Sequence, residues 1–157
     1  MENQEIAVLL VDDNATVLWG LGKLIEGDAP RLRLLGKARG RREALLLAGD
    51  HPDVIVLDLD LDGYSSLDML PELLRLSGGA VLIHTGLADP RLHAAALRGG
   101  AKGVVKKGEP AEVILQAIKC VHGGRIWNSA TSALPGRDGK GNCHSPWSPL
   151  SQETRAC

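Results

Sequence analysis

The chain has 157 residues, of which 44% are hydrophobic and 24% charged, and its formal net charge is −1. This size allows one domain with a real hydrophobic core plus an appendage, and the core must be largely aliphatic because the chain has no Phe and a single Tyr. The near-neutral charge excludes the whole chain as an electrostatic binder of DNA or of membrane surfaces, and no apolar run approaches a membrane span.

Nothing at the N-terminus or in the cysteine pattern points to secretion. Residues 1–5 contain no basic residue of the kind that opens a signal peptide. The three cysteines, Cys120, Cys143 and Cys157, form no regular framework. We therefore expect a cytoplasmic protein with reduced thiols and no membrane association.

The first half of the chain alternates short apolar runs with helix-period segments. Residues 6–11 form a continuous apolar strand, as expected for a strand that is covered on both faces. Apolar residues then recur at helical spacing over residues 17–25. A weaker strand at 31–38, a helix at 41–48 and a third strand at 54–57 follow. This alternation predicts βα units and a parallel sheet.

The second half repeats the alternation, with a helix at 66–76, a strand at 80–84, a helix at 90–98, a strand at 103–106 and a helix from 110 to 122. Asp89 and Pro90 are typical of an N-cap followed by proline in the first helical turn. Gly123 and Gly124 end the last helix. The chain thus contains five predicted βα units within its first 124 residues.

Polar side chains follow four of the five predicted strands: Asp12 and Asp13 after the first, Asp58 after the third, Thr85 after the fourth and Lys107 after the fifth. Because ligands bind beyond the carboxyl ends of parallel strands, we expect these groups to converge. Such a collection is costly unless a cation joins it, and carboxylate oxygens suit Mg²⁺. A phosphoryl group could then be held by the Lys and the Thr while an Asp acts as nucleophile.

This order of strand-end residues resembles the response regulator receiver family over about residues 6–124. The resemblance implies a flavodoxin-like (βα)5 doubly wound α/β sheet with strand order 2-1-3-4-5. It also implies that Asp58 accepts a phosphoryl group from the phosphohistidine of a sensor histidine kinase. A second copy of the chain is an expected partner, through the last two βα units or through the first and last helices.

The remaining roles are implied by the same resemblance. The Mg²⁺ ligands would be Asp12, Asp13, Asp58 and the backbone carbonyl of Asp60. Thr85 takes the position of the hydroxyl that binds a phosphoryl oxygen, and Lys107 takes the position of the family's lysine. Gly86 fits the small residue that leaves the acceptor open to attack.

Two segments, 99–107 and 123–127, resemble the NarL/LuxR-type subgroup of the family. Residues 149–155 resemble the opening of that subgroup's helix-turn-helix output domain, after which the sequence stops. We therefore predict a receiver domain at 1–124, a linker at 125–149, and at 150–157 either the truncated start of the output domain or a flexible, disordered tail. Without a recognition helix, this chain alone is expected not to bind DNA, and any transcriptional output would need the missing domain.

Four positions depart from the family pattern. Asp62 and Ser66 stand where the loop after the acceptor commonly has Pro and Gly. Pro71 falls early in the third helix, which it should kink or shorten. Val104 occupies the position that is commonly Tyr or Phe, so we expect the site to couple to the surface weakly or differently, without a swinging aromatic ring.

Two other classes of function stay open at this stage. The strand at 54–57 followed by Asp58 and Asp60 resembles the first motif of haloacid-dehalogenase-type phosphatases. That interpretation leaves Asp12 and Asp13 without a role and finds no acidic pair after Lys107. A receiver-like module that signals by binding alone, without phosphorylation, is the other alternative. The complete set of acceptor residues argues against it, and the altered loop keeps it open.

Two remaining residue types receive structural interpretations. The five histidines, His84 among them, show no metal-ligand spacing, and we expect solvated or core roles for them. Trp127 is expected to pack against the exit from the last helix.

Overall fold

The computed structural model describes residues 5–128 and 143–144. The helices are α1 (Ala15–Gly27), α2 (Arg41–Ala48), α3 (Leu70–Ser77), α4 (Pro90–Arg98) and α5 (Ala111–His122), with a 3₁₀ turn, η1 (Ser66–Met69). The strands are β1 (Ile6–Val11), β2 (Leu32–Ala38), β3 (Val54–Leu57), β4 (Asp60–Leu61), β5 (Tyr64–Ser65), β6 (Ala80–Thr85), β7 (Gly103–Lys106), β8 (Trp127–Asn128) and β9 (Cys143–His144). The predicted start of an output domain lies outside the described residues.

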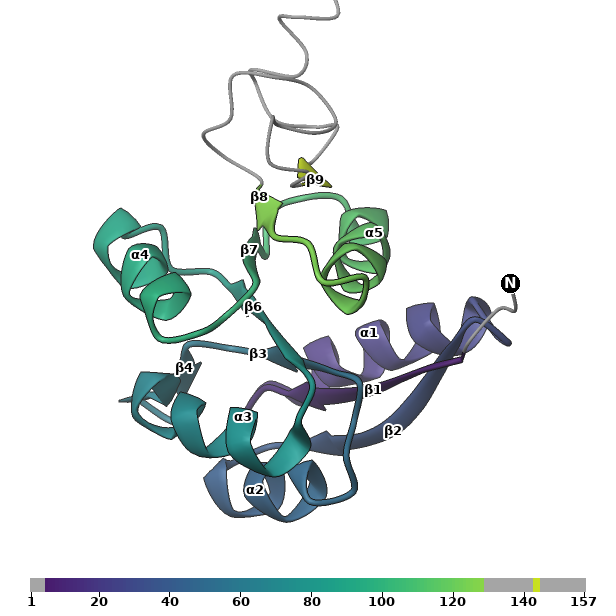
Figure 1. The fold of residues 1–157 in the computed structure, drawn as a ribbon, viewed down its shortest axis with the longest axis horizontal. Helices are drawn as coiled ribbons and strands as arrows, with labels where there is room; N and C mark the ends of the chain where they lie inside the picture. The colour runs from purple at the N-terminus through teal and green to yellow at the C-terminus, as the bar shows by residue number, and fades with distance from the viewer. Residues whose placement is uncertain (1–4, 129–142, 145–157) are drawn as a thin grey trace, which may run out of the picture.

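The main sheet is parallel and contains the five predicted strands in the predicted order. Its neighbours run β2-β1-β3-β6-β7, which confirms the flavodoxin-like topology (Figure 1). Strands β8 and β9 extend the sheet beyond β7, also in parallel. The predicted strand order is therefore correct, and the sheet is wider than predicted.

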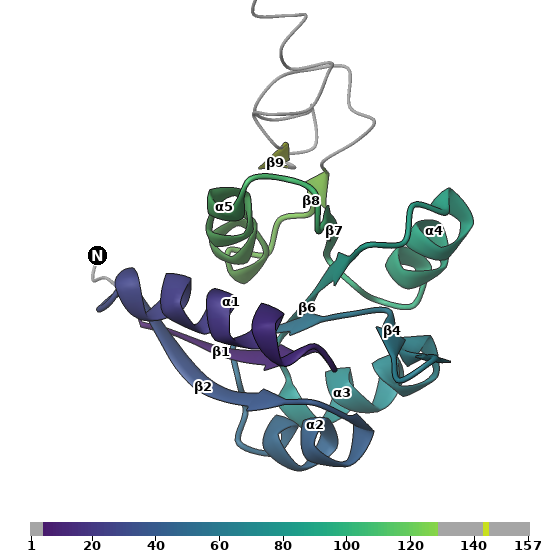
Figure 2. The ribbon, with the colours of Figure 1, turned by 180° about the vertical axis from the view of Figure 1, so that it is seen from behind.

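Two helical layers cover the sheet and produce two separate cores. Helices α1 and α5 lie on one face, and α2 and α3 lie on the other (Figures 1 and 2). Alternate side chains of β1 enter different cores: Val8 and Leu10 face α1 and α5, whereas Leu9 and Val11 face the opposite layer. Because both faces are covered, the strand is apolar throughout and shows no polar alternation.

The helix boundaries follow from capping residues. Asn14 accepts hydrogen bonds from the amides of Thr16 and Val17 at the start of α1. Asp89 accepts from the amide of Arg91, as the predicted N-cap of α4 should. The predicted helix at 66–76 is divided, because α3 begins only at Leu70 after the 3₁₀ turn. Proline is tolerated in the first turn of a helix, and Pro71 lies in the first turn of this shortened one.

A short hairpin, β4–β5, follows β3 and was not predicted. Its turn residues, Asp62 and Gly63, have φ values of 54° and 81°. Positive φ at both central positions is what a tight hairpin turn requires, and Asp-Gly is a preferred pair for it. The Asp-Gly pair was therefore the sequence signal for this element.

The edge of the sheet beyond β7 is built around Trp127. This residue pairs with Gly103 of β7, is 3% exposed and belongs to the core beneath α1 and α5. A Cβ atom on Gly103 would lie 2.6 Å from the Cβ of Trp127, so only glycine allows this approach. The expected packing of Trp127 at the helix exit is confirmed, and β8 lies beyond the predicted end of the domain at residue 124.

One feature of α5 differs from the expected reduced thiols. Cys120 is 3% exposed and is joined in a disulfide.

Among the described residues, none of the helices has the length and apolar character that a membrane crossing would need.

Candidate functional site

The carboxyl ends of four neighbouring strands lie at one edge of the sheet. In the strand register, Val11 pairs with Leu57, and Thr85 pairs with Lys106. The residues that follow β1 and β3 are therefore adjacent, as are those that follow β6 and β7. Each of the acids Asp12, Asp13 and Asp58 places a carboxylate oxygen within 4.8 Å of the other two.

Two of these acids are buried. Asp12 is 2% exposed and Asp58 is 6% exposed. The backbone amide of Asp58 donates to the carbonyl of Val11 at 3.0 Å, which aligns the end of β3 with the end of β1. The carboxylate of Asp12 accepts from the amide of Asn14 at 2.9 Å, so it also orders the start of α1.

Lys107 joins the two buried acids. Its Nζ lies 2.8 Å from Oδ2 of Asp12 in an ion pair and 3.0 Å from Oδ2 of Asp58, to which it donates a hydrogen bond. Its neighbour Lys106 is exposed. Of the two adjacent lysines, the structure therefore brings Lys107 to the acids.

The charges of this cluster shift one another's proton affinity. Burial raises the pKa of Asp58, a hydrogen bond from Lys107 works against that rise, and the negative charge of Asp12 adds to it. For Lys107, burial alone would lower the pKa, but the hydrogen bonds to Asp12 and Asp58 outweigh it and raise the pKa. Lys107 therefore stays protonated. Burial makes the charged form of Asp58 less favourable than it would be in water.

The donor set fits a divalent cation. Three carboxylates and one ammonium leave an excess negative charge at a partly buried edge, which an added cation would offset. Oxygen donors with a side open to solvent suit Mg²⁺, which keeps several of its waters. Asp60 is exposed, and Oδ1 of its carboxylate accepts from the amide of Gly63 at 3.1 Å, so its side chain stabilises the hairpin turn, whereas the resemblance assigns its backbone carbonyl to the metal.

Asp13 connects the acid cluster to the hairpin. Its Oδ2 accepts from the backbone amide of Asp62 at 2.8 Å, at the turn between β4 and β5. Its backbone carbonyl accepts from the guanidinium of Arg39 at 3.2 Å. The hairpin that replaces the usual loop is therefore held against the site by one of the acids of the site.

Ser66 was not predicted to take part in the site. It is 2% exposed, and its hydroxyl donates to the backbone carbonyl of Asp58 at 2.6 Å. This contact fixes the backbone that carries the central acid. A serine at a position where the resemblance implies glycine was the available signal, but its partner could not be inferred from the sequence.

Thr85 ends β6 and Gly86 follows it, next to Lys107. Thr85 is fully buried, and its Oγ1 accepts from the amide of Leu87 at 3.0 Å, so its hydroxyl proton remains free to be donated. A Cβ on Gly86 would find its nearest atom, Cδ of Lys107, at 4.0 Å. Val104 is buried in the core beneath α2 and α3, with an exposed fraction of 8%.

The arrangement has the parts needed for transfer of a phosphoryl group to a carboxylate. A buried carboxylate can act as nucleophile, and an ammonium and a hydroxyl donor can hold the oxygens of the transferred group. A cation between the carboxylates would offset the charge that accumulates.

Comparison with known proteins identifies relatives with this architecture. Residues 8–119 match the family described as the response regulator receiver domain. The chain is 32% identical over 121 residues to the nitrate/nitrite response regulator protein NarL of Escherichia coli, which covers 75% of this chain and 56% of NarL. It is 27% identical to the transcriptional regulatory protein DesR of Bacillus subtilis, over 76% of this chain and 60% of DesR. The chain therefore spans less than two thirds of the length of either relative.

A solved structure of a response regulator also has this fold. A two-component response regulator of the LuxR family from Aurantimonas sp. superimposes with a TM-score of 0.72 at 25% identity, over 98% of this chain and all of that one.

Proposed function

The chain belongs to the response regulator receiver family, in its NarL/LuxR-type branch, and from that premise we propose that it accepts a phosphoryl group on Asp58 from a sensor histidine kinase. The position of Lys107, 3.0 Å from Asp58 and 2.8 Å from Asp12, is the observation that carries the proposal. An ammonium between two carboxylates is the group that a dianionic phosphoryl group would attract once it is attached to Asp58.

In the proposed reaction, a carboxylate oxygen of Asp58 attacks the phosphorus of a phosphohistidine in line with the leaving imidazole. The new P–O bond forms as the P–N bond breaks, and the electron pair of that bond stays on the nitrogen. The imidazole of the kinase, which already carries a proton on its other nitrogen, leaves as a neutral ring. The Lys107 ammonium turns from the carboxylate to a phosphoryl oxygen, and the Thr85 hydroxyl donates a hydrogen bond to another phosphoryl oxygen.

Asp12, Asp13 and Asp58, with the backbone carbonyl of Asp60, would hold Mg²⁺. The ion would supply charge neutralisation for the transferred group. Before an ion binds, Lys107 lies beside Asp12 and Asp58 and offsets part of their negative charge. The Ser66 hydroxyl also positions the nucleophile, because its hydrogen bond to the Asp58 carbonyl restrains the backbone of that residue.

The two alternative functions are less well supported. A haloacid-dehalogenase-type phosphatase would need the Asp60 carboxylate as its acid/base, whereas that carboxylate caps the Gly63 amide. It would also leave Asp12 unused, although Asp12 is buried and paired with the lysine. A module that binds without phosphorylation has no need of a buried, costly charge cluster. We accordingly infer a signalling receiver that turns over nothing except its own acyl phosphate.

The cellular location, the partners, the domain limits and the output of the protein are also proposals. We place the protein in the cytoplasm, with a sensor kinase as its partner and a second copy as a possible one, through the last two βα units or through α1 and α5. Domain limits of 1–124 for the receiver, 125–149 for a linker and 150–157 for the start of an output domain or a tail belong to the same proposal, with the edge strand at Trp127 still part of the receiver's sheet. The output would be transcriptional, as the name of the relative DesR, a transcriptional regulatory protein, suggests, and it would need a DNA-binding domain.

Intact-mass measurement after incubation with acetyl phosphate and Mg²⁺ tests this function. We expect a gain of one phosphoryl group that is lost in Asp58→Asn. Asp60→Asn is the matched control, because Asp60 is exposed and its backbone carbonyl is unchanged by the substitution, so it should be labelled normally. Labelling that persists in Asp58→Asn, or that disappears only in Asp60→Asn, would overturn the assignment of the acceptor.

A further inference from the structure

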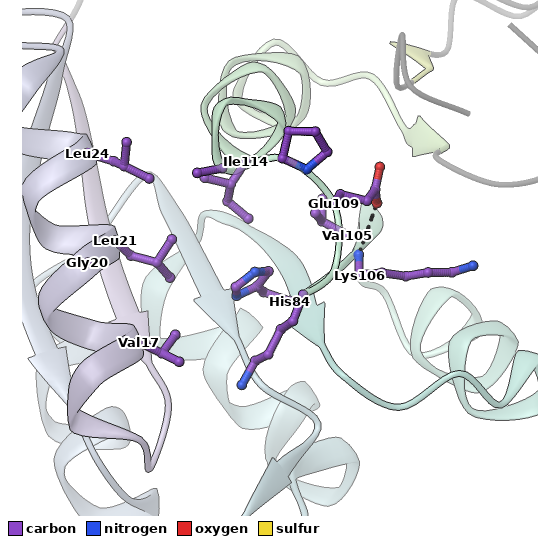
Figure 3. A pocket seen from close by; sticks show the side chains of 12 residues that line it. Val17, Gly20, Leu21, Leu24, His84, Val105, Lys106, Glu109 and Ile114 are labelled. Atoms are coloured by element: carbon purple, nitrogen blue, oxygen red, sulfur yellow. Dashed lines mark hydrogen bonds between the residues drawn. The ribbon is translucent and has the colours of Figure 1, made fainter. Parts of the chain in front are cut away.

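A groove of about 400 Å³ lies between α1 and the beginning of α5, on the face of the sheet away from α2 and α3 (Figure 3). Val17, Leu21 and Leu24 of α1 form one wall, and Ile114 of α5 forms part of the other (Figure 3). Its volume lies within the range of small-molecule sites, and its walls are mostly aliphatic, as such sites usually are.

Gly20 keeps the α1 wall of this groove open. It lies in the middle of a helix, where glycine is among the least favourable residues. A Cβ atom at this position would meet nothing within 4 Å, so packing of the fold does not require glycine here. The absence of a side chain therefore costs helix stability and leaves space in the groove.

His84 is an uncharged polar residue in the lining of the groove, and its ring lies between the α1 wall and the start of α5 (Figure 3). Its Nδ1 is buried and has no hydrogen-bond partner in the part of the chain that the structure describes. Burial and then the positive charge of Lys107, opposed by the negative charge of Asp12, lower the pKa of His84 to about 4, so the ring is neutral near pH 7. A neutral imidazole has one donor and one acceptor nitrogen, and here that capacity is not fully used.

The charged groups around the groove exclude a charged ligand. The Lys107 ammonium lies against Asp12 and Asp58, and these two carboxylates already offset its charge on the side of the groove nearest the acids. The Glu109 carboxylate accepts from the Lys106 amide at 3.1 Å, and the Lys106 ammonium points away from the groove (Figure 3). A buried charge without a partner is costly, so the occupant should be uncharged.

We propose that this groove binds a small, neutral, ring-sized molecule whose apolar body lies between α1 and Ile114 and whose hydroxyl group hydrogen-bonds to the His84 imidazole. A hydroxyl suits either tautomer, because it can both donate and accept. The proposal goes beyond the phosphoryl-transfer function and does not depend on the chemistry of Asp58.

Titration with para-cresol, followed by amide and imidazole NMR shifts, tests the proposal. We expect shifts at residues 17–24, at His84 and at residues 111–114, with a Kd of about 1 mM, as is typical of a fragment of this size. Toluene lacks the hydroxyl and should bind about fivefold more weakly, the value of one hydrogen bond. The anion para-toluate should not bind. Shifts elsewhere, or toluene binding as tightly as para-cresol, would overturn the proposal.

Two variants separate the groove from the hydrogen bond. Gly20→Leu fills the groove and should abolish binding, whereas Gly27→Leu, at an exposed α1 glycine outside the groove that also has no atom within 4 Å of its Cβ position, should bind para-cresol normally. His84→Leu should keep an apolar groove and remove the preference of para-cresol over toluene. Unchanged binding by Gly20→Leu, or a retained preference in His84→Leu, would contradict the site.

Discussion

Lys107 lies between two buried carboxylates, and each of these charges depends on the others. Removing the lysine would leave Asp12 and Asp58 as like charges at a buried edge, which is the costly way to break a buried ion pair. The raised pKa of Asp58, caused first by burial, shows that its charged form is already strained. A cation bound between these carboxylates would relieve that cost.

His84 makes the stability of the fold depend on pH. Burial and then the charge of Lys107, opposed by Asp12, lower the pKa of His84 from 6.5 to about 4. Below pH 6.5 the unfolded chain therefore binds a proton that the folded chain refuses until about pH 4. The contribution of the neutral His84 ring to the free energy of unfolding is complete above pH 6.5, the pKa of the ring in the unfolded chain. This contribution is lost as the pH falls toward about 4, the pKa of the ring in the folded chain.

We expect the free energy of unfolding in urea to fall by about 2 kcal/mol between pH 6.5 and pH 5, the linkage value for a His that stays neutral across that window. His84→Leu should remove most of this slope. His122→Gln, on α5, serves as the control and should keep it. A slope that survives His84→Leu would assign the pH dependence to another group.

Among the elements, β8 depends on one glycine. Gly103 allows Trp127 to approach β7, and an added Cβ would lie 2.6 Å from the Trp127 Cβ and 2.9 Å from its carbonyl oxygen. Backbone atoms cannot yield as a flexible side chain can, so Gly103→Ala should push β8 away from the sheet and partly expose Trp127.

The expected cost of Gly103→Ala is about 2 kcal/mol, in the range for overpacking a core. Urea unfolding followed by tryptophan fluorescence measures it, and the emission of the folded variant should shift to the red. Gly108→Ala is the control, because nothing lies within 4 Å of its Cβ position. If Gly103→Ala is as stable as Gly108→Ala, the pairing of β8 with β7 contributes little to the fold.

At the scale of the whole molecule, the ends of separate strands meet at one charged edge. A cation that binds the acids there binds only the folded chain, because the unfolded chain does not bring Asp12 and Asp58 together. Mg²⁺ should therefore stabilise the fold against heat, and EDTA should reverse the effect.

At a Mg²⁺ concentration ten times its Kd, the expected gain is about 1.4 kcal/mol. NaCl at the same ionic strength is the control, since screening of surface charges needs no specific ion. Asp12→Asn should lose most of the Mg²⁺ effect, whereas Asp50→Asn, in the loop after α2, should keep it. An equal response to NaCl and to Mg²⁺ would count against a metal site.

Much of the fold was predictable because its signals are local. The apolar run of β1, the Asp89–Pro90 pair before α4 and the glycines after α5 each act within one element, and the structure confirms these elements. The hairpin β4–β5 had a local signal in Asp62 and Gly63, but its strands have two residues each and show no periodicity. The short strand β8 was missed for the same reason.

Part of the candidate site was predictable from the sequence, and part was not. Residue types at strand ends were enough to nominate Asp12, Asp58 and Lys107, because parallel strands bring their carboxyl ends to one edge whatever the details of packing. The contact between Ser66 and the Asp58 carbonyl, and the hairpin amide on Asp13, join residues whose pairing depends on the path of an irregular loop.

Sequence patterns alone were sufficient for the αβ alternation, the strand order through resemblance, and the residue types that gather at the edge of the sheet. Three-dimensional packing was needed to join the Ser66 hydroxyl to the Asp58 carbonyl, to pair Trp127 with Gly103 at the edge of the sheet and to place His84 in a groove beside Gly20. The physical reason is the distance along the sequence over which each effect acts. Periodicity, capping and turn preferences act over a few neighbouring residues, whereas burial and hydrogen bonding between distant segments exist only after the chain has folded.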